Sequence, residues 1–396
     1  MKIRILVAFS GLIISSLASS QQTINTWYDA AKTIKKESYT VVRDKKDSLV
    51  KHGKYTIWYE NKVIWQEGMY NQNMLVGLWK DYYDTGILKQ ELPYSNNLLN
   101  GVLKYYYPSG KIQQELSYQN DILNGKVVSY YESGATQEIA LYSNNQLNAE
   151  FKSYYENGQL QFVKNYKNGL ENGPVTAYFE NGKIREKSFK LNGAYEGLYT
   201  DFYKDFNEGA VNKTCYYKYG KLNGKLTAYY PKGKVKIECN YENDLIKGKY
   251  TEYYDSTGVV RETGEFLNNK RNGLWTAYYP KGNIFSKGNY KADKFDGVWT
   301  VYHENGKVKQ TGTFVDGKAT GEWLIYYETG ELQNKGGYSN NNKSGKWLTY
   351  YKNGQLMTEI NFVDGQRDGQ AKSYDKKGKL VETTLYKNGE KQTVKQ

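Results

Sequence analysis

Glycine recurs along this sequence at a nearly constant spacing of 24 residues. The series consists of Gly53, Gly77, Gly101, Gly125, Gly173, Gly197, Gly224, Gly248, Gly273, Gly297, Gly321, Gly345 and Gly369, and Ala149 stands in the one missing place. A period of this length is the signature of tandem repeats, in which one small structural unit stacks on the next. The sequence therefore predicts about 14 repeats, and those from Gly197 and Gly248 are longer, with 27 and 25 residues.

Each repeat contains two stretches of strand-forming residues. With the leading glycine as offset zero, offset two is apolar or aromatic in every repeat and offset five is always aromatic. A turn sequence such as Glu304-Asn305-Gly306 follows, which suits a type I turn with glycine in the left-handed conformation. The second stretch has an aromatic residue near offset seventeen, for example Tyr290. Because Tyr, Trp, Thr and Val favour strands, each repeat is predicted to be a β-hairpin.

Successive hairpins are predicted to join through a second tight turn. Dipeptides at the repeat starts, such as Asn100-Gly101 and Asp296-Gly297, suggest that this turn lies there. Short turns on both sides make neighbouring strands antiparallel. The predicted fold class is therefore all-β, an elongated single-layer antiparallel sheet of about 14 tandem hairpins and about 28 strands. Since side chains alternate, offsets two and six share one face and offset five lies on the other.

Two segments precede the repeats. Residues 1–20 place Lys2 and Arg4 before an apolar stretch of about 13 residues, the pattern of a cleaved secretory signal peptide. The alternative is an uncleaved anchor, although the stretch is shorter than the roughly 20 residues of a membrane-spanning helix. Residues 21–52 are predicted to cap the repeat array of residues 53–396, with a short helix over 24–36 and an added strand over 39–43. We expect export to the periplasm, the outer-membrane surface or the medium.

The repeats from Gly273 and Gly321 read GLWTAYYPKGNIFSKGNYKADKFD and GEWLIYYETGELQNKGGYSNNNKS. They resemble the bacterial MORN repeat variant, whose pattern is Gly-x-Trp-x-x-Tyr-Tyr-x-x-Gly followed by an apolar strand that ends in Gly-x-Tyr. The resemblance covers about residues 53–390 and is weaker in the repeats from Gly53, Ala149 and Gly173. It implies an elongated sheet of hairpins with an interaction or scaffold role. Proteins of this variant are often classed as antitoxin components of toxin–antitoxin pairs.

Histidine and cysteine, which are typical of catalytic and metal sites, are scarce in this sequence. The histidines are His52 and His303, and the expected role of His303 is a tolerated substitution in an aromatic row. Cys215 and Cys239 occupy equivalent second strands with one strand between them, about 10 Å apart, so we expect no disulfide. Their spacing does not fit a zinc motif either. We therefore expect no enzyme, no cofactor and no metal site.

The remaining candidate for function is the aromatic row of the sheet, although the same rings could simply form its structural ladder. Exposed Tyr and Trp are typical of protein interfaces, and they can also stack on sugars or cations. The candidate interaction face consists of Trp79, Tyr83, Trp275, Tyr279, Trp299, Trp323, Tyr327, Trp347 and Tyr351.

Three functions stay open at this point. They are an exported scaffold for a protein partner or an envelope polymer, a cell-wall glycan-binding module, and an antitoxin-like component. The net charge is +13 but no long basic run occurs, so no specific nucleic acid partner is expected. The oligomeric state is left open.

Overall fold

The computed structural model describes residues 21–205 and 209–392. These residues form 36 strands and no helix, and neighbouring strands are antiparallel, as in β3–β4 and β32–β33. The chain divides into two compact units, one up to Glu171 and the other from Asn172. The predicted signal segment, residues 1–20, lies outside the described residues.

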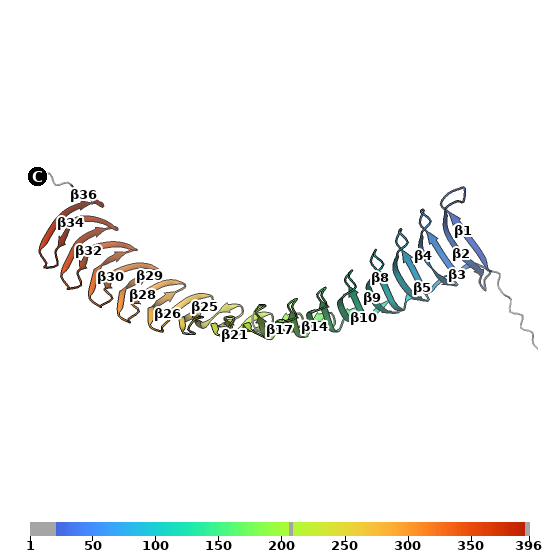
Figure 1. Ribbon diagram of the computed structural model, residues 1–396, viewed down its shortest axis with the longest axis horizontal. Coiled ribbons are helices and arrows are strands. Elements are labelled where there is room, and N and C mark those ends of the chain that lie inside the picture. The colour runs from blue at the N-terminus through green and yellow to red at the C-terminus, as the bar shows by residue number, and fades with distance from the viewer. Residues whose placement is uncertain (1–20, 206–208, 393–396) are drawn as a thin grey trace, which may run out of the picture. The chain divides into compact units, whose positions relative to one another are not determined.

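The first unit is a single open layer in which the strands follow chain order (Figure 1, blue to green). Its strands are β1 Gln22–Trp27, β2 Lys35–Arg43, β3 Leu49–Trp58, β4 Ile64–Asn71, β5 Met74–Tyr82, β6 Leu88–Ser95, β7 Leu98–Leu99, β8 Gly101–Tyr106, β9 Ile112–Gln119, β10 Ile122–Tyr130, β11 Thr136–Ser143, β12 Gln146–Leu147, β13 Ala149–Tyr154, β14 Leu160–Lys167 and β15 Leu170–Glu171.

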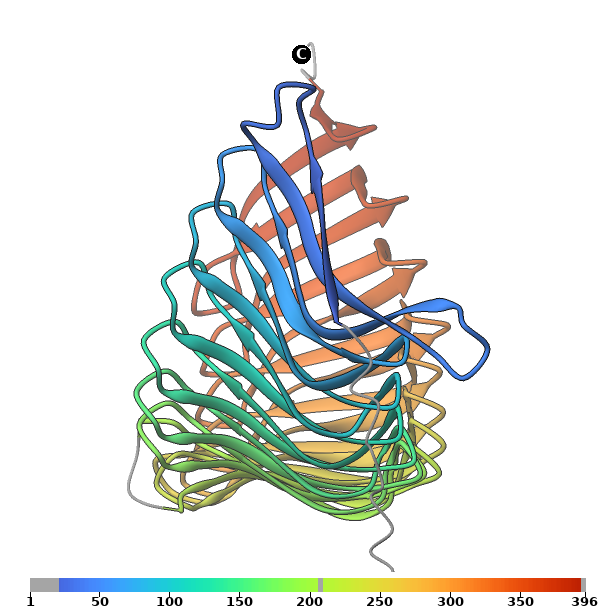
Figure 2. The same cartoon turned by 90° about the vertical axis from the view of Figure 1, so that its right-hand side faces the viewer.

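The second unit is built in the same way, and Figure 2 shows its orange-to-red strands side by side in one layer. Its strands are β16 Gly173–Tyr178, β17 Ile184–Leu191, β18 Ala194–Tyr195, β19 Gly197–Phe202, β20 Val211–Lys218, β21 Lys221–Tyr229, β22 Val235–Glu242, β23 Leu245–Ile246, β24 Gly248–Tyr253, β25 Val260–Leu267, β26 Lys270–Tyr278, β27 Ile284–Lys291, β28 Lys294–Tyr302, β29 Val308–Val315, β30 Lys318–Tyr326, β31 Leu332–Ser339, β32 Asn342–Tyr350, β33 Leu356–Val363, β34 Gln366–Tyr374, β35 Leu380–Lys387 and β36 Glu390–Lys391.

The predicted N-terminal helix is wrong. Residues 24–36 contain the end of β1, a loop and the start of β2, and the two strands pair with each other. The Asp29 carboxylate closes the loop by accepting the amide N–H groups of Thr33 and Ile34 at 3.0 and 2.8 Å. The strand predicted over 39–43 is confirmed as part of β2, which also pairs with β3. Backbone pairing of β1 with β2 and of β2 with β3 outweighs a helical spacing that rests on a few apolar residues.

The second turn also lies elsewhere than predicted. Asn96 and Asn97 both have positive φ, 51° and 70°, which is the type I′ turn of a two-residue hairpin. The leading glycines lie four residues further on, inside the strands or at their first residue, at β-bulges. At Gly77 φ is +70°, and the β4–β5 register shifts between Glu67 and Met69. The prediction at Asn100-Gly101 is therefore wrong: positive φ is required there, but by a bulge rather than by the turn.

The bulges help to explain why the strands outnumber the expected 28. In five repeats the bulge separates a two-residue strand from the main one, as with β7 and β8. The first turn is confirmed as predicted: Gly306 has φ +83° and its N–H donates to the His303 carbonyl at 2.9 Å.

One face of the sheet holds most of the large buried side chains. We call it the ladder face, and it carries offsets two and seventeen; the other is the outer face, which carries offsets one, three and five. At offset two, Trp79, Leu103 and Trp275 are each only 2% exposed. The predicted placement of offset five opposite offset two is confirmed, because the Tyr82 hydroxyl bonds Glu67 on the outer face.

Each tryptophan of this row covers a glycine on the preceding strand. A Cβ added at Gly312 would lie 2.1 Å from the Trp323 ring, so no other residue fits there without movement. These Trp–Gly pairs are Gly68–Trp79, Gly264–Trp275, Gly288–Trp299, Gly312–Trp323 and Gly336–Trp347. Where offset two is smaller, its partner is larger, as in the register pairs Leu116–Val127 and Ile360–Ala371.

Candidate interaction surface

The structure assigns most of the predicted tryptophans to the packing of the ladder face. Trp79 and Trp275 are 2% exposed, Trp347 is 6% and Trp323 is 7%, whereas Trp299 is half-buried. Their rings meet offset-seventeen rings edge to face, as in Tyr338–Trp347 at 5.2 Å between centroids. The structure therefore does not offer these four buried rings as a contact surface.

The tyrosines at offset six tie each repeat to the next. The hydroxyls of Tyr83, Tyr279, Tyr327 and Tyr351 donate to a backbone carbonyl 23 residues further on, at 3.0, 2.9, 2.8 and 2.9 Å. At the same position the His303 Nε2 lies 3.2 Å from the Tyr326 carbonyl oxygen. His303 therefore takes the place of a ladder tyrosine, as the sequence predicted.

Cations lie over several rings of the ladder face, which the sequence analysis did not anticipate. Arg271 is 4.3 Å from the Trp275 ring centroid, and the Lys343 ammonium is 4.3 Å from that of Trp347. In both cases the basic residue comes four positions before the tryptophan, so this spacing was the available signal. Such contacts stabilise the ring row by cation–π attraction.

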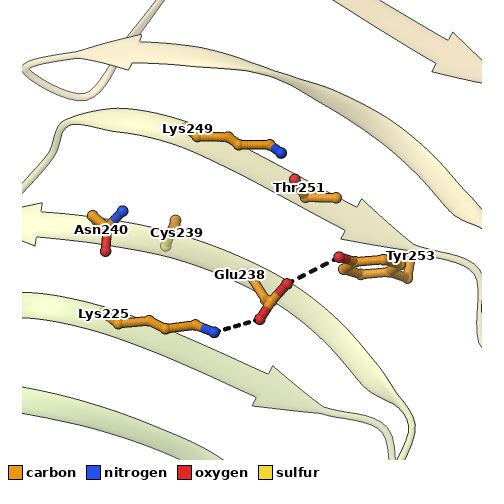
Figure 3. A pocket seen from close by; sticks show the side chains of 7 residues that line it. All are labelled: Lys225, Glu238, Cys239, Asn240, Lys249, Thr251 and Tyr253. Atoms are coloured by element: carbon orange, nitrogen blue, oxygen red, sulfur yellow. Dashed lines mark hydrogen bonds and ion pairs between the residues drawn. The ribbon is translucent and has the colours of Figure 1, made fainter.

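The outer face carries repeated networks of lysine, glutamate and tyrosine. Figure 3 shows Glu238 between Lys225 and Tyr253, with an Nζ–Oε1 distance of 2.6 Å and a hydroxyl–Oε2 distance of 2.9 Å. The hydrogen bond from Lys225 lowers the pKa of the Glu238 carboxyl. A hollow of about 190 Å³ borders the network, and its lining also includes Cys239, Asn240, Lys249 and Thr251.

This network is structural, because it recurs. Glu91 has an ion pair with Lys80 at 3.7 Å and accepts the Tyr106 hydroxyl at 3.0 Å, and Glu115 has the same two kinds of partner. Burial first, and then the neighbouring glutamates, raise the pKa of Tyr82 and that of Tyr106 to about 12. A hollow on a recurring network gives no reason to infer a ligand.

Exposed apolar side chains gather on the outer face of the second unit. Phe189, Leu198 and Tyr216 are 41%, 48% and 47% exposed, and Pro174 is exposed beside them. Pro174 pairs with Phe189 and Leu198 pairs with Tyr216 in register. Phe189 and Leu198 also border one hollow of about 460 Å³. We call Pro174, Phe189, Leu198 and Tyr216 the apolar strip; the sequence analysis missed it because it sought function on the other face.

The two cysteines are buried and free. Both pair with Leu226, from opposite sides, which confirms the predicted intervening strand. Burial raises the pKa of Cys239 to about 11, which keeps this thiol protonated and poorly reactive at neutral pH.

In the described part of the chain, no cluster of three or more His, Cys, Asp or Glu residues could hold a metal ion. The same residues include no helix that could cross a bilayer. The insertion in the repeat from Gly197 falls partly on residues 206–208, which lie outside the described residues.

The chain has a local likeness to several large toxin structures. It is 11% identical to a chain of the crystal structure of TcdB2-TccC3-Cdc42, with 92% of this chain and 27% of that chain covered and a TM-score of 0.14. For a Photorhabdus luminescens Tc holotoxin pore the identity is 12%, the coverage 89% and 23%, and the TM-score 0.14. The chain thus spans about a quarter of the length of these proteins, and TM-scores this low support no argument about fold or function.

Among curated protein sequences no significant match is found. A family model described as the MORN repeat variant matches twelve segments, which together make up more than half of the chain. The segments are residues 51–72, 75–96, 99–120, 123–144, 147–168, 171–190, 222–243, 271–292, 295–316, 319–340, 343–364 and 367–388.

The number of matched repeats is therefore twelve rather than about 14. The two longer repeats, from Gly197 and Gly248, are not matched as repeats of their own, although β19–β20 and β24–β25 pair there as hairpins. The repeat-by-repeat match and the sheet of hairpins agree, and this chain belongs to the MORN repeat variant family.

Proposed function

We propose that this chain is an exported, non-enzymatic scaffold that binds a protein partner on the outer face of its second unit. The apolar strip is the observation that carries this proposal. It presents three large side chains that are more than 40% exposed and that lie next to one another across neighbouring strands. Contiguous exposed apolar side chains on a soluble surface are typical of interaction sites.

The composition of the strip fits a protein interface. Phe189 and Tyr216 supply aromatic anchors, and the polar side chains of Lys187 and Glu196 border the same hollow as Phe189. An apolar centre inside a polar rim is the usual anatomy of a specific interface. The ladder face is less suited to this role, because its rings already pack against each other.

Export and lack of catalysis belong to the same proposal. The sequence of residues 1–20 supports export, and the scarcity of histidine and reactive cysteine supports a binding role. Repeats that differ little from one another suit an extended binding surface better than a single reactive centre. We propose that the exported protein acts in the periplasm, at the outer membrane or outside the cell.

Site-specific photo-crosslinking in the producing cells tests the proposal. A crosslinking residue replaces Leu198 in one variant and Leu274 in the control, which is also at offset one and is 54% exposed but lies outside the strip. We expect one protein to be captured at position 198 and not at 274, and the capture to be lost when Phe189→Ser is added. Equal capture at both positions, or no capture at 198, would contradict the proposal.

The antitoxin-like alternative makes a different prediction for the same experiment. It requires a single partner that binds one-to-one and whose toxicity is suppressed by this chain. If the captured protein is harmless when produced alone, the antitoxin-like role is excluded and the scaffold role stands. The glycan-binding alternative concerns another surface.

A further inference from the structure

A third hollow lies on the ladder face of the first unit, where the packed aromatic row gives way to polar side chains. It has a volume of about 360 Å³ and is lined by Tyr105, Tyr107, Gln113, Gln114, Ser129 and Gln137. This volume falls within the range of small-molecule sites, roughly 300 to 1,000 Å³. The lining consists of two phenol rings, three side-chain amides and one hydroxyl, with no charged group.

Tyr105 sets this repeat apart from the others. It occupies offset four, where the other repeats have Ile57, Asp81, Ser129, Ser153, Ala177, Asp201, Ala228, Glu252, Ala277, Val301, Ile325, Thr349 and Ser373. The repeat architecture therefore does not require an aromatic ring there. In register Tyr105 faces Gln90 on one side and Gln114 on the other, so its ring lies among amide groups.

Several polar groups of the hollow have no hydrogen-bond partner among the residues that the structure describes. Among the described residues, no hydrogen bond involves the Tyr105 hydroxyl or the side chains of Gln113 and Gln137, whereas the Gln114 amide donates to the Ser129 hydroxyl at 3.3 Å. Tyr107 is held in place, because its hydroxyl donates to the Tyr130 carbonyl at 2.7 Å. A side-chain amide both donates and accepts, which matches the hydroxyl groups of a sugar.

The charge of the site points to a neutral ligand. Although the chain carries a net charge of +13, the lining has no cation to hold an anionic group. Glu138 faces Ser129, one of the lining residues, in register, and its carboxylate would repel an acidic ligand. A flat ring beside uncharged donors and acceptors suits a sugar ring, which has an apolar C–H face and hydroxyl groups around its edge.

We propose that this hollow is a binding site for a neutral oligosaccharide, with one sugar ring against Tyr105 and its hydroxyls bonded to Gln113, Gln114 and Gln137. The site is independent of the apolar strip, since it belongs to the other unit and to the ladder face. It adds a second binding activity to the scaffold role.

Isothermal titration of the whole mature chain with neutral trisaccharides tests this site. The probes are chitotriose, cellotriose and maltotriose, and a trimer of galacturonic acid is the acidic comparison. We expect saturable binding of at least one neutral probe and at least tenfold weaker binding of the acidic one. Tyr105→Ala should weaken the neutral probe at least tenfold, whereas Tyr105→Phe, which keeps the ring, should weaken it less.

The glutamine variants guard against an effect on folding alone. Gln113 is exposed, so Gln113→Ala leaves the packing unchanged, and combined with Gln137→Ala it should weaken binding about tenfold. Gln333→Ala is the matched control, because Gln333 has the offset of Gln113 but lies in the second unit. Absence of binding by every neutral probe, or equal binding by the Tyr105→Ala chain, would overturn the proposal. Crosslinking at position 198 is expected to persist in all these variants, which separates failure of this site from failure of the scaffold role.

Discussion

The repeats from Gly101 and Gly125 in the first unit and those from Gly297 to Gly345 in the second fill the same place on the ladder face in opposite ways. In the first unit Leu103 and Val127 flank Leu116, so three side chains of similar size share the space. In the second unit Trp323 covers Gly312, so one large ring fills the room of two side chains. The volume of the pair is conserved while its division differs, which is the kind of change that a packed core tolerates. The repeat is therefore specified by pairs of positions rather than by single residues.

A second difference lies in the residue that packs over the offset-two side chain. Two positions before the leading glycine, the repeats from Gly101 and Gly125 have Leu99 and Leu123, whereas those from Gly273 and Gly345 have Arg271 and Lys343. Over indole rings these cations gain cation–π attraction, which aliphatic partners cannot supply. Two tryptophans of the row, Trp275 and Trp347, are thus covered by a cation.

The largest effect is expected when only one member of a pair is exchanged. Gly312→Leu introduces the first unit's residue beneath Trp323, and the added Cβ would lie 2.1 Å from the ring. We expect a local loss of about 3 kcal/mol, because the ring must leave its site. Hydrogen exchange of the full chain measures it as faster exchange in β29 to β31, with the first unit as internal reference.

The double variant Gly312→Leu with Trp323→Val sharpens the comparison. It rebuilds the Leu116–Val127 pair in the second unit and also removes the Trp323 indole N–H, which is buried without a partner. We expect it to recover more than half of the loss, a coupling within the range measured for contacting residues. If the two losses simply added, the pairing rule would be refuted.

Removal of a covering cation should cost less. Arg271 lies over Trp275 at 4.3 Å and pairs with Glu262 at 2.8 Å, so Arg271→Ala is expected to lower local stability by about 1 to 2 kcal/mol. Arg271→Leu, which copies Leu99 and Leu123, should lose less than the alanine variant because it still covers the ring. Urea unfolding followed by tryptophan fluorescence ranks the two variants. Equal losses of stability would show that the charge of Arg271, and not apolar contact with the Trp275 ring, provides the stabilisation.

The bulge position allows a smaller test in which stability should rise. Ala149 has φ +106°, whereas glycine occupies this place in the other repeats. Ala149→Gly should therefore stabilise the first unit by about 1 kcal/mol, because positive φ is strained for a residue with a Cβ. The converse change in the second unit, Gly321→Ala at φ +67° with open space around its Cβ, should destabilise by a similar amount. Both changes are measured as shifts of the thermal unfolding midpoint. An unchanged midpoint in both variants would contradict the claim that positive φ strains alanine at these sites.

Sequence reasoning succeeded where one local pattern decides the structure. The Glu304-Asn305-Gly306 turn, the alternation of faces and the strand between Cys215 and Cys239 all follow from spacing. It failed where the same residue type serves two geometries. Asn-Gly indicates positive φ, but only the register shows whether that belongs to a turn or to a bulge. The apolar strip and the hollow at Tyr105 arise between strands of different repeats, and a search for conserved rows overlooks the positions at which repeats differ.

The smallest expected effect concerns alkaline pH. Burial and a neighbouring glutamate raise the pKa of Tyr82 and that of Tyr106 to about 12, against about 10 in an unfolded chain. Folding therefore favours the neutral phenols, so their contribution is complete below about pH 10 and is lost as the pH rises toward 12. The first unit, which contains both, should show faster hydrogen exchange over this range.

Glu91→Gln removes the carboxylate beside Tyr106 and should move the tyrosinate absorbance transition to lower pH, although burial, the larger cause, remains. Glu238→Gln, beside Tyr253 in the second unit, is the corresponding test with the same expected shift, and an unchanged transition in both variants would assign the pKa shifts to burial alone.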